Sequence, residues 1–197
     1  MNLPNKLTLL RILIIPIIII ISLINALNIN IGSDFSITLQ NLIILVLFAI
    51  ASFTDFLDGN IARKRNLVTD FGKFMDPLAD KLLVMSALII ALEQGRFNVF
   101  GLGLGFVVII ILAREFMVTG IRLIASGSSH KVIAASKLGK YKTATQMIMI
   151  IFILFNYPNQ VGFEIFKLVI IAIPFILTVI SGVDYFMKNK DIILKDK

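Results

Sequence analysis

The stretch "RILIIPIIIIISLI", from Arg11 to Ile24, is a run of apolar residues interrupted only by one proline and one serine. In water, a run so rich in isoleucine would suggest a buried strand. In hydrocarbon, however, an open strand leaves its backbone groups unpaired, and the alternating pattern of a membrane barrel is absent from this run. The run therefore predicts a membrane-spanning helix.

The composition of the whole chain agrees with this prediction. Of the 197 residues, 58% are hydrophobic, which exceeds the roughly 45–50% of soluble domains, and the mean hydropathy is +0.95. Apolar runs long enough to cross a bilayer, about 20 residues each, lie at Leu7–Leu27, Ile37–Phe56, Met75–Leu92, Val99–Leu123, Thr143–Tyr157 and Phe163–Phe186. We therefore expect an all-α integral membrane protein with six transmembrane helices, in which residues 1–197 form a single membrane domain.

Two features of the composition limit the possible functions. The sequence has no cysteine, which excludes disulfides, thiolate nucleophiles and zinc–thiolate sites. Its net charge of +7 could indicate nucleic-acid binding, but in a membrane protein it is more typical of loops held against an anionic cytoplasmic leaflet. We expect no nucleic-acid partner.

The basic residues also predict the orientation of the spans. They gather before the first span, between the second and third, between the fourth and fifth, and after the sixth, whereas the other connections have almost none. Cytoplasmic loops are enriched in lysine and arginine. Both termini are therefore expected in the cytoplasm of a multi-pass protein of the cell membrane. Lys6 and Arg11 ahead of an apolar run imitate a signal peptide, but no clean cleavage site follows, so we expect an uncleaved span.

Four acidic residues interrupt the apolar pattern, namely Asp55, Asp58, Asp76 and Asp80. The first two are three residues apart at the end of the second span, and the last two are four apart at the start of the third, so each pair shares a helix face. Antiparallel packing of these two spans would bring the faces together at the cytoplasmic side. Four carboxylates about 4–6 Å apart repel one another and require a cation. Ligands that are all oxygen suit Mg²⁺, Mn²⁺ or Ca²⁺, and two such ions would hold phosphoryl oxygens for an in-line displacement.

Neighbouring residues also favour phosphate chemistry. Gly59 and Ala62 leave one surface of the second span bare enough for a phosphate or a planar group to touch the backbone, and Gly72 does the same for the third. Arg63 adds a fork of donors that suits phosphate oxygens. Pro77 predicts a distorted first turn of the third span.

These positions resemble a known family pattern. The series Asp55-x-x-Asp58-Gly59-x-x-Ala62-Arg63, followed by Gly72-x-x-x-Asp76-x-x-x-Asp80, is similar to the complete signature of the CDP-alcohol phosphatidyltransferases. The resemblance extends along the chain through "PNKLTLLR" (4–11), "AREF" (113–116) and "KLGKYKT" (137–143). Within the family, "GKFMDPLADKLL" (72–83) and "REFMVTGIRL" (114–123) are most similar to members that join CDP-diacylglycerol to glycerol 3-phosphate.

The resemblance implies an activity and a role for each signature residue. The phosphatidyl group of CDP-diacylglycerol would pass to glycerol 3-phosphate and CMP would leave, with two divalent metal ions, Mg²⁺ or Mn²⁺, in the site. The metal ligands would be Asp55, Asp58 and Asp76, with Asp80 close to the ions as the general base for the acceptor hydroxyl. The CDP-diacylglycerol site would be lined by Gly59, Ala62, Arg63 and Gly72. The family also implies a homodimer surrounded by membrane lipids.

Glycerol 3-phosphate has a phosphate of its own, so we expect a second cationic pocket. The candidate residues are Arg114, Arg122, Lys137 and Lys140, together with Thr8 and Arg11, which match the amino-terminal pattern of the family. Arg114 lies in apolar sequence, where an unpaired arginine costs several kcal/mol. Its neighbour Glu115 is the alternative, purely structural partner.

Several alternatives remain open. Lys137 and Lys140 fit membrane anchoring as well as phosphate binding, and we expect Lys131 and Lys142 to be anchors. The same chemistry could use serine, inositol phosphate or phosphatidylglycerol as the acceptor. A divalent-cation transporter would also need acidic residues, but such sites lie near the bilayer midplane and often between repeated halves. Here the acidic residues lie at one edge and no repeat is visible.

Overall fold

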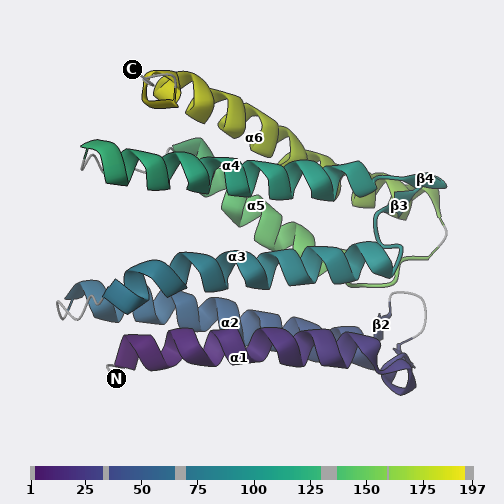
Figure 1. Ribbon diagram of the computed structural model, residues 1–197. Coiled ribbons are helices and arrows are strands. Elements are labelled where there is room, and N and C mark those ends of the chain that lie inside the picture. Colours follow the sequence, from purple (N-terminus) through teal and green to yellow (C-terminus); the bar gives the residue numbers. More distant parts are fainter. Residues whose placement is uncertain (1–2, 33–35, 65–69, 130–136, 159, 194–197) are drawn as a thin grey trace. The chain divides into compact units, whose positions relative to one another are not determined.

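The computed structural model describes residues 3–32, 36–64, 70–129, 137–158 and 160–193. In this part of the chain the α-helices are α1 (Leu3–Leu23), α2 (Leu39–Lys64), α3 (Asp70–Glu93), α4 (Gly105–Ser129), α5 (Lys137–Ile153) and α6 (Val161–Ile193) (Figure 1). A 3₁₀ turn at Asn25–Leu27 and two small hairpins lie in the connections. The hairpins pair β1 (Asn30–Ile31) with β2 (Ile37–Thr38), and β3 (Asn98–Val99) with β4 (Leu102–Gly103). The predicted all-α class is confirmed.

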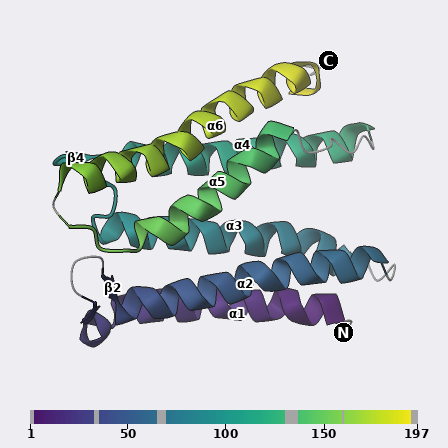
Figure 2. The same cartoon turned by 180° about the vertical axis from the view of Figure 1, so that it is seen from behind.

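The helices belong to two units, each described by itself. The first unit contains α1, α2 and α3 and also the segment Leu154–Pro158. In it α1 packs along both α2 and α3, and α2 runs opposite to the other two (Figure 2). The second unit contains α4, α5 and α6, and α6 packs against both of the others.

Each unit is held by apolar side chains that recur at helical spacing. In the first unit Ile14 and Ile18 of α1, Ile44 and Phe48 of α2, and Leu83 of α3 are buried. The outward faces remain apolar, as expected of helices that lie in lipid. Among the described residues, α1 over Asn5–Leu23 and α6 over Val161–Lys190 are long and apolar enough to cross a membrane.

The side chain of Gln40 closes the end of α1. Its Nε2 donates to the carbonyls of Ile21 at 3.0 Å and Ser22 at 2.9 Å, which are among the last carbonyls of that helix. A helix end leaves such carbonyls without an intrahelical partner. The start of α2 is capped in turn by Thr38, whose Oγ1 accepts from the Asn41 backbone N–H at 3.1 Å. Local side chains therefore terminate one helix and begin the next.

Arg96 attaches the connection between α5 and α6 to the end of α3. Its Nη1 donates to the Phe155 carbonyl at 3.3 Å and to the Asn156 side chain, and Asn156 also bridges to Ser36. Burial lowers the pKa of Arg96. Burial also raises the pKa of Tyr157 to about 12, although the charge of Arg96 acts in the opposite direction. Tyr157 is therefore a neutral group beside a cation at physiological pH.

Several predicted span limits are wrong because the chain turns where the sequence is still apolar, as the first and fourth spans show. The first helix ends at Leu23 rather than at residue 27, where the chain enters the 3₁₀ turn. The fourth begins at Gly105, because Val99 belongs to a hairpin. The hairpin turn places Phe100 at φ 49° and Gly101 at φ 76°, and two successive positive φ values suit a tight two-residue turn.

The third helix begins earlier than predicted. It starts at Asp70 rather than at Met75, so Asp76 and Pro77 lie in its second turn and not in a distorted first turn. A proline at this depth removes one backbone hydrogen bond, and the apolar turns that follow keep the helix continuous. The carboxylates of Asp76 and Asp80 therefore project from α3 beyond its first turn.

Candidate active site

Three signature residues lie on one face of α3. Gly72, Asp76 and Asp80 follow one another at intervals of four residues, so they share that face. Gly72 is buried, and both carboxylates are half-buried. Such carboxylates can be approached by a ligand and are still partly shielded from bulk water, which strengthens their interaction with a cation.

The first turns of α1 supply a polar partner for this face. The Thr8 hydroxyl donates to Asp76 Oδ1 at 2.5 Å, and Thr8 and Arg11 are both buried, at 1% and 0% exposed. Because these residues are three apart, they share a face of α1. A hydroxyl that donates to a carboxylate helps to hold the orientation of that carboxylate. The structure thus places Thr8 with the aspartates, and its predicted role in acceptor binding stays a prediction.

The remaining signature residues lie in the last turns of α2, which runs to Lys64. They are Asp55, Asp58, Gly59, Ala62 and Arg63, and their side chains lie outside the described part of the structure. The predicted convergence of four carboxylates is therefore not tested. Among the residues whose side chains are described, no three acidic or histidine residues form a group that could hold a metal ion.

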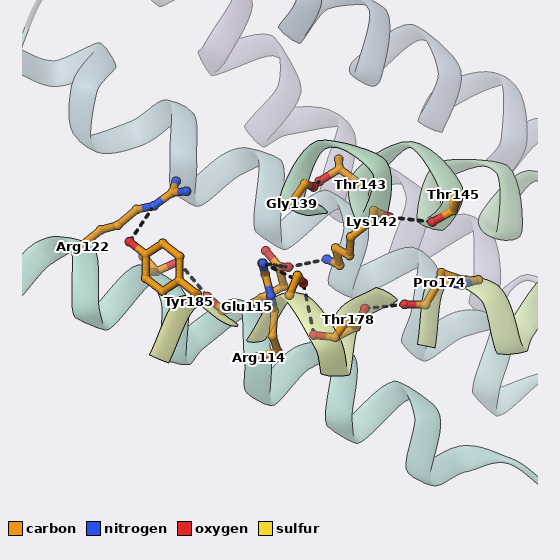
Figure 3. Close-up of polar contacts among 12 residues, drawn as sticks. Arg114, Glu115, Arg122, Gly139, Lys142, Thr143, Thr145, Pro174, Thr178 and Tyr185 are labelled. Carbon is orange, nitrogen blue, oxygen red and sulfur yellow. Dashed lines mark hydrogen bonds and ion pairs between the residues drawn. The ribbon is translucent and has the colours of Figure 1, made fainter. Parts of the chain in front are cut away.

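A second polar group lies in the second unit, between α4, α5 and α6 (Figure 3). Glu115 Oε1 accepts from Arg114 Nη1 at 3.1 Å and from the Lys142 ammonium. Arg114 Nη2 also donates to Ser181 Oγ of α6 at 3.1 Å. Three helices are thus connected through one carboxylate and one guanidinium. The ion pair with Glu115 supports the structural expectation for Arg114, and its role in phosphate binding stays a prediction.

The other predicted cationic residues have different surroundings. Arg122 is exposed and lies against Tyr185, with its Nε 3.3 Å from the tyrosine hydroxyl and its guanidinium carbon 5.6 Å from the ring centre. Lys140 is exposed on α5. Lys137 begins α5, and its side chain lies outside the described residues. A stacked arginine keeps donors that face outward and can bind an anion.

Three residues of this second group were not anticipated from the sequence as parts of a site. The prediction that Lys142 is an anchor is wrong, because its side chain is only 3% exposed and pairs with Glu115. Ser181 and Tyr185 are also buried, and their contacts come from helices far apart in the sequence. Lysine spacing on α5 cannot distinguish an anchor from a buried ion pair. Only the packing of α4 against its neighbours does so.

Comparison with known proteins gives one family for nearly the whole chain. The model of the family described as CDP-alcohol phosphatidyltransferase matches residues 1–180. A Bacillus subtilis protein named "CDP-diacylglycerol--glycerol-3-phosphate 3-phosphatidyltransferase" is 47% identical over 95% of this chain and 95% of its own length. A Haemophilus influenzae protein of the same name is 34% identical over 98% of this chain and 96% of its own. A Mycobacterium tuberculosis protein named "Probable phosphatidylglycerophosphate synthase" is 37% identical over 93% of this chain and 79% of its own.

Proposed function

The chain belongs to the CDP-alcohol phosphatidyltransferase family, and from this premise we propose that it transfers the phosphatidyl group of CDP-diacylglycerol to glycerol 3-phosphate. The products are phosphatidylglycerophosphate and CMP. One observation supports this choice of acceptor above all: the chain is similar over nearly its whole length to enzymes named for that reaction, at 47% identity in one case. The enzyme is thus a phosphatidyltransferase of phospholipid biosynthesis.

The aspartates are the proposed metal site. Asp55, Asp58 and Asp76 would hold the ions, with Asp80 close to them. The donor set fits, because it consists of carboxylate oxygens, which Mg²⁺ and Mn²⁺ prefer. The Thr8 hydroxyl on Asp76 supports this assignment, since metal-ligating carboxylates are themselves held by hydrogen bonds. Two bound ions would neutralise the diphosphate and align it for in-line attack.

Asp80 is the proposed general base. A half-buried carboxylate one turn beyond Asp76 can take the proton of the acceptor hydroxyl, and cations held by the other aspartates would neutralise the diphosphate. The acceptor oxygen then forms a bond to the phosphorus that carries diacylglycerol, and the bond from that phosphorus to CMP breaks. No covalent intermediate on the protein is required.

The two substrates have separate proposed sites. CDP-diacylglycerol lies along Gly59, Ala62, Arg63 and Gly72, and the buried position of Gly72 supports close approach of another group to that helix face. The acceptor phosphate is bound by Arg114, Arg122, Lys137 and Lys140, with Thr8 and Arg11. The exposed, tyrosine-stacked guanidinium of Arg122 supports this set.

We further propose that residues 1–197 form one membrane domain with six transmembrane helices, both termini in the cytoplasm and the active site on that side of the cell membrane. The apolar lengths of α1 and α6 and the apolar outward faces support several spans. The positions of the basic residues support the orientation. A homodimer is the proposed assembly.

The proposed function is tested by the release of CMP from CDP-diacylglycerol by the purified full chain, with and without Mg²⁺ or Mn²⁺. Glycerol 3-phosphate, serine, inositol phosphate and phosphatidylglycerol are offered as acceptors in turn. We expect metal-dependent release with glycerol 3-phosphate and little with the others. Activity with serine but not with glycerol 3-phosphate would overturn the choice of acceptor and keep the family.

A further inference from the structure

Tyr185 holds the guanidinium of Arg122. The Nε atom of Arg122 donates to the tyrosine hydroxyl at 3.3 Å, and the guanidinium carbon lies 5.6 Å from the centre of the same ring (Figure 3). Arg122 belongs to α4 and Tyr185 to α6, which pack together in the second unit. The hydroxyl and the ring of Tyr185 therefore both attract the guanidinium.

The tyrosine ring is itself fixed by its surroundings. Tyr185 is 4% exposed and packs with Val118 and Ile121 of α4 in a buried apolar cluster. A buried ring with close-packed neighbours has little freedom to change its rotamer. A guanidinium that is bound to such a ring has a defined position, whereas an exposed arginine without a partner samples many rotamers.

The terminal nitrogens of Arg122 remain available to a ligand. The residue is exposed, and among the contacts of the described residues only its Nε has a hydrogen-bond partner. Figure 3 shows Nη1 and Nη2 pointing away from the tyrosine hydroxyl. Two neighbouring guanidinium nitrogens suit a phosphate, which they bind through two parallel hydrogen bonds.

The chemical type of the partner preserves the charge of Arg122. Tyrosine is an uncharged side chain at neutral pH, whereas a carboxylate at the same place would neutralise the arginine. Within the described part of the chain Arg122 forms no ion pair, so its attraction for an anion is not reduced. The contact with Tyr185 thus combines a defined geometry with a full positive charge.

We propose that Tyr185 is a positioning residue for the acceptor: it holds the Arg122 guanidinium so that Nη1 and Nη2 bind the phosphate of the acceptor. This inference rests on the proposed function, in which Arg122 belongs to the acceptor site. Tyr185 is buried and does not touch the substrate. Its replacement should therefore weaken the binding of glycerol 3-phosphate and not that of CDP-diacylglycerol.

The test measures KM for each substrate in the CMP-release assay. Tyr185→Phe removes the hydroxyl and keeps the packed ring, so we expect KM for glycerol 3-phosphate to rise about threefold to tenfold. KM for CDP-diacylglycerol should stay within about twofold of the wild-type value. Tyr141→Phe is the matched control, because it removes the hydroxyl of a tyrosine that is 65% exposed on α5, and it should leave both KM values unchanged. Thermal unfolding in detergent shows that each variant is folded.

A double-mutant cycle shows whether Tyr185 acts through Arg122. We expect Arg122→Gln to raise KM for glycerol 3-phosphate by about tenfold or more. In the Arg122→Gln background, Tyr185→Phe should add less than about twofold, because the guanidinium that it positions is absent. A tyrosine with only a structural role would raise KM by the same factor in both backgrounds, or would raise KM for both substrates together. Either result, or an unchanged KM for glycerol 3-phosphate in Arg122→Gln, would overturn the positioning role.

The two proposals fail differently. If the wild-type chain releases no CMP with glycerol 3-phosphate, the proposed function is refuted and the inference with it. If the wild type is active with this acceptor and Tyr185→Phe leaves its KM unchanged, only the role of Tyr185 is refuted.

Discussion

At the scale of single residues, the two described aspartates of the signature share one face of α3. Thr8 of α1 donates to Asp76, and the carboxylate of Asp80 lies one turn further along α3. A carboxylate oriented by a hydroxyl suits metal binding, whereas a general base must be able to exchange a proton. The Thr8 contact supports the proposed metal-binding role of Asp76, and the role of Asp80 as base stays a prediction.

Replacement of Asp80 and replacement of Thr8 should have different kinetic effects. Asp80→Asn removes the base, and we expect turnover to fall by at least about 100-fold at every Mg²⁺ concentration, with CDP-diacylglycerol binding retained. Thr8→Val should raise the Mg²⁺ concentration for half-maximal activity by about 10-fold to 100-fold, so that activity recovers at high Mg²⁺. Titration of CMP release with Mg²⁺ measures both.

Thr145→Val is the control for this comparison, because the Thr145 hydroxyl bonds only to the Tyr141 and Lys142 carbonyls of its own helix among the contacts described. We expect it to leave the Mg²⁺ titration unchanged. Asp80→Asn with turnover near that of the wild type would remove Asp80 from the role of base.

At the scale of elements, polar side chains at the helix ends determine where the apolar runs stop. The apolar sequence of the first span continues to residue 27, but α1 ends at Leu23, and Gln40 of α2 binds its last carbonyls. Neither hydropathy nor spacing near Leu23 identifies that end, because the partner lies in the next helix. Helix type and number could thus be predicted from local periodicity, whereas their exact limits depended on contacts between elements.

Gln40→Leu tests the importance of this closure. The variant removes the side-chain donor from the part-buried carbonyls of Ile21 and Ser22, and a hydrogen bond of this kind contributes about 0.5–1.5 kcal/mol, so we expect a lower melting temperature. Circular dichroism of the protein in detergent during heating measures the change. Ser86→Ala is the control, because its exposed hydroxyl bonds only to the Leu82 carbonyl of its own helix among the described contacts. Equal melting temperatures for both variants would show that Gln40 does not stabilise the junction.

At the scale of the whole molecule, the distribution of lysine and arginine predicts which connections face the cytoplasm. The sequence contains no cysteine, so single cysteines can report on each connection without a background. In intact cells, a membrane-impermeant maleimide should label Asp34→Cys, between the first two spans. It should label Lys195→Cys only after the membrane is permeabilised. Labelling of Lys195→Cys in intact cells would reverse the proposed orientation.

The helical architecture and the aspartate signature followed from the sequence, because length, apolarity and the spacing of three or four residues act within one helix. The partners of those residues did not. That Thr8 belongs with Asp76, that Lys142 is buried on Glu115, and that Ser181 and Tyr185 hold the two arginines became apparent only when distant helices were packed together. Burial and ion pairing are properties of neighbours in space, and periodicity along a single helix has no information about them.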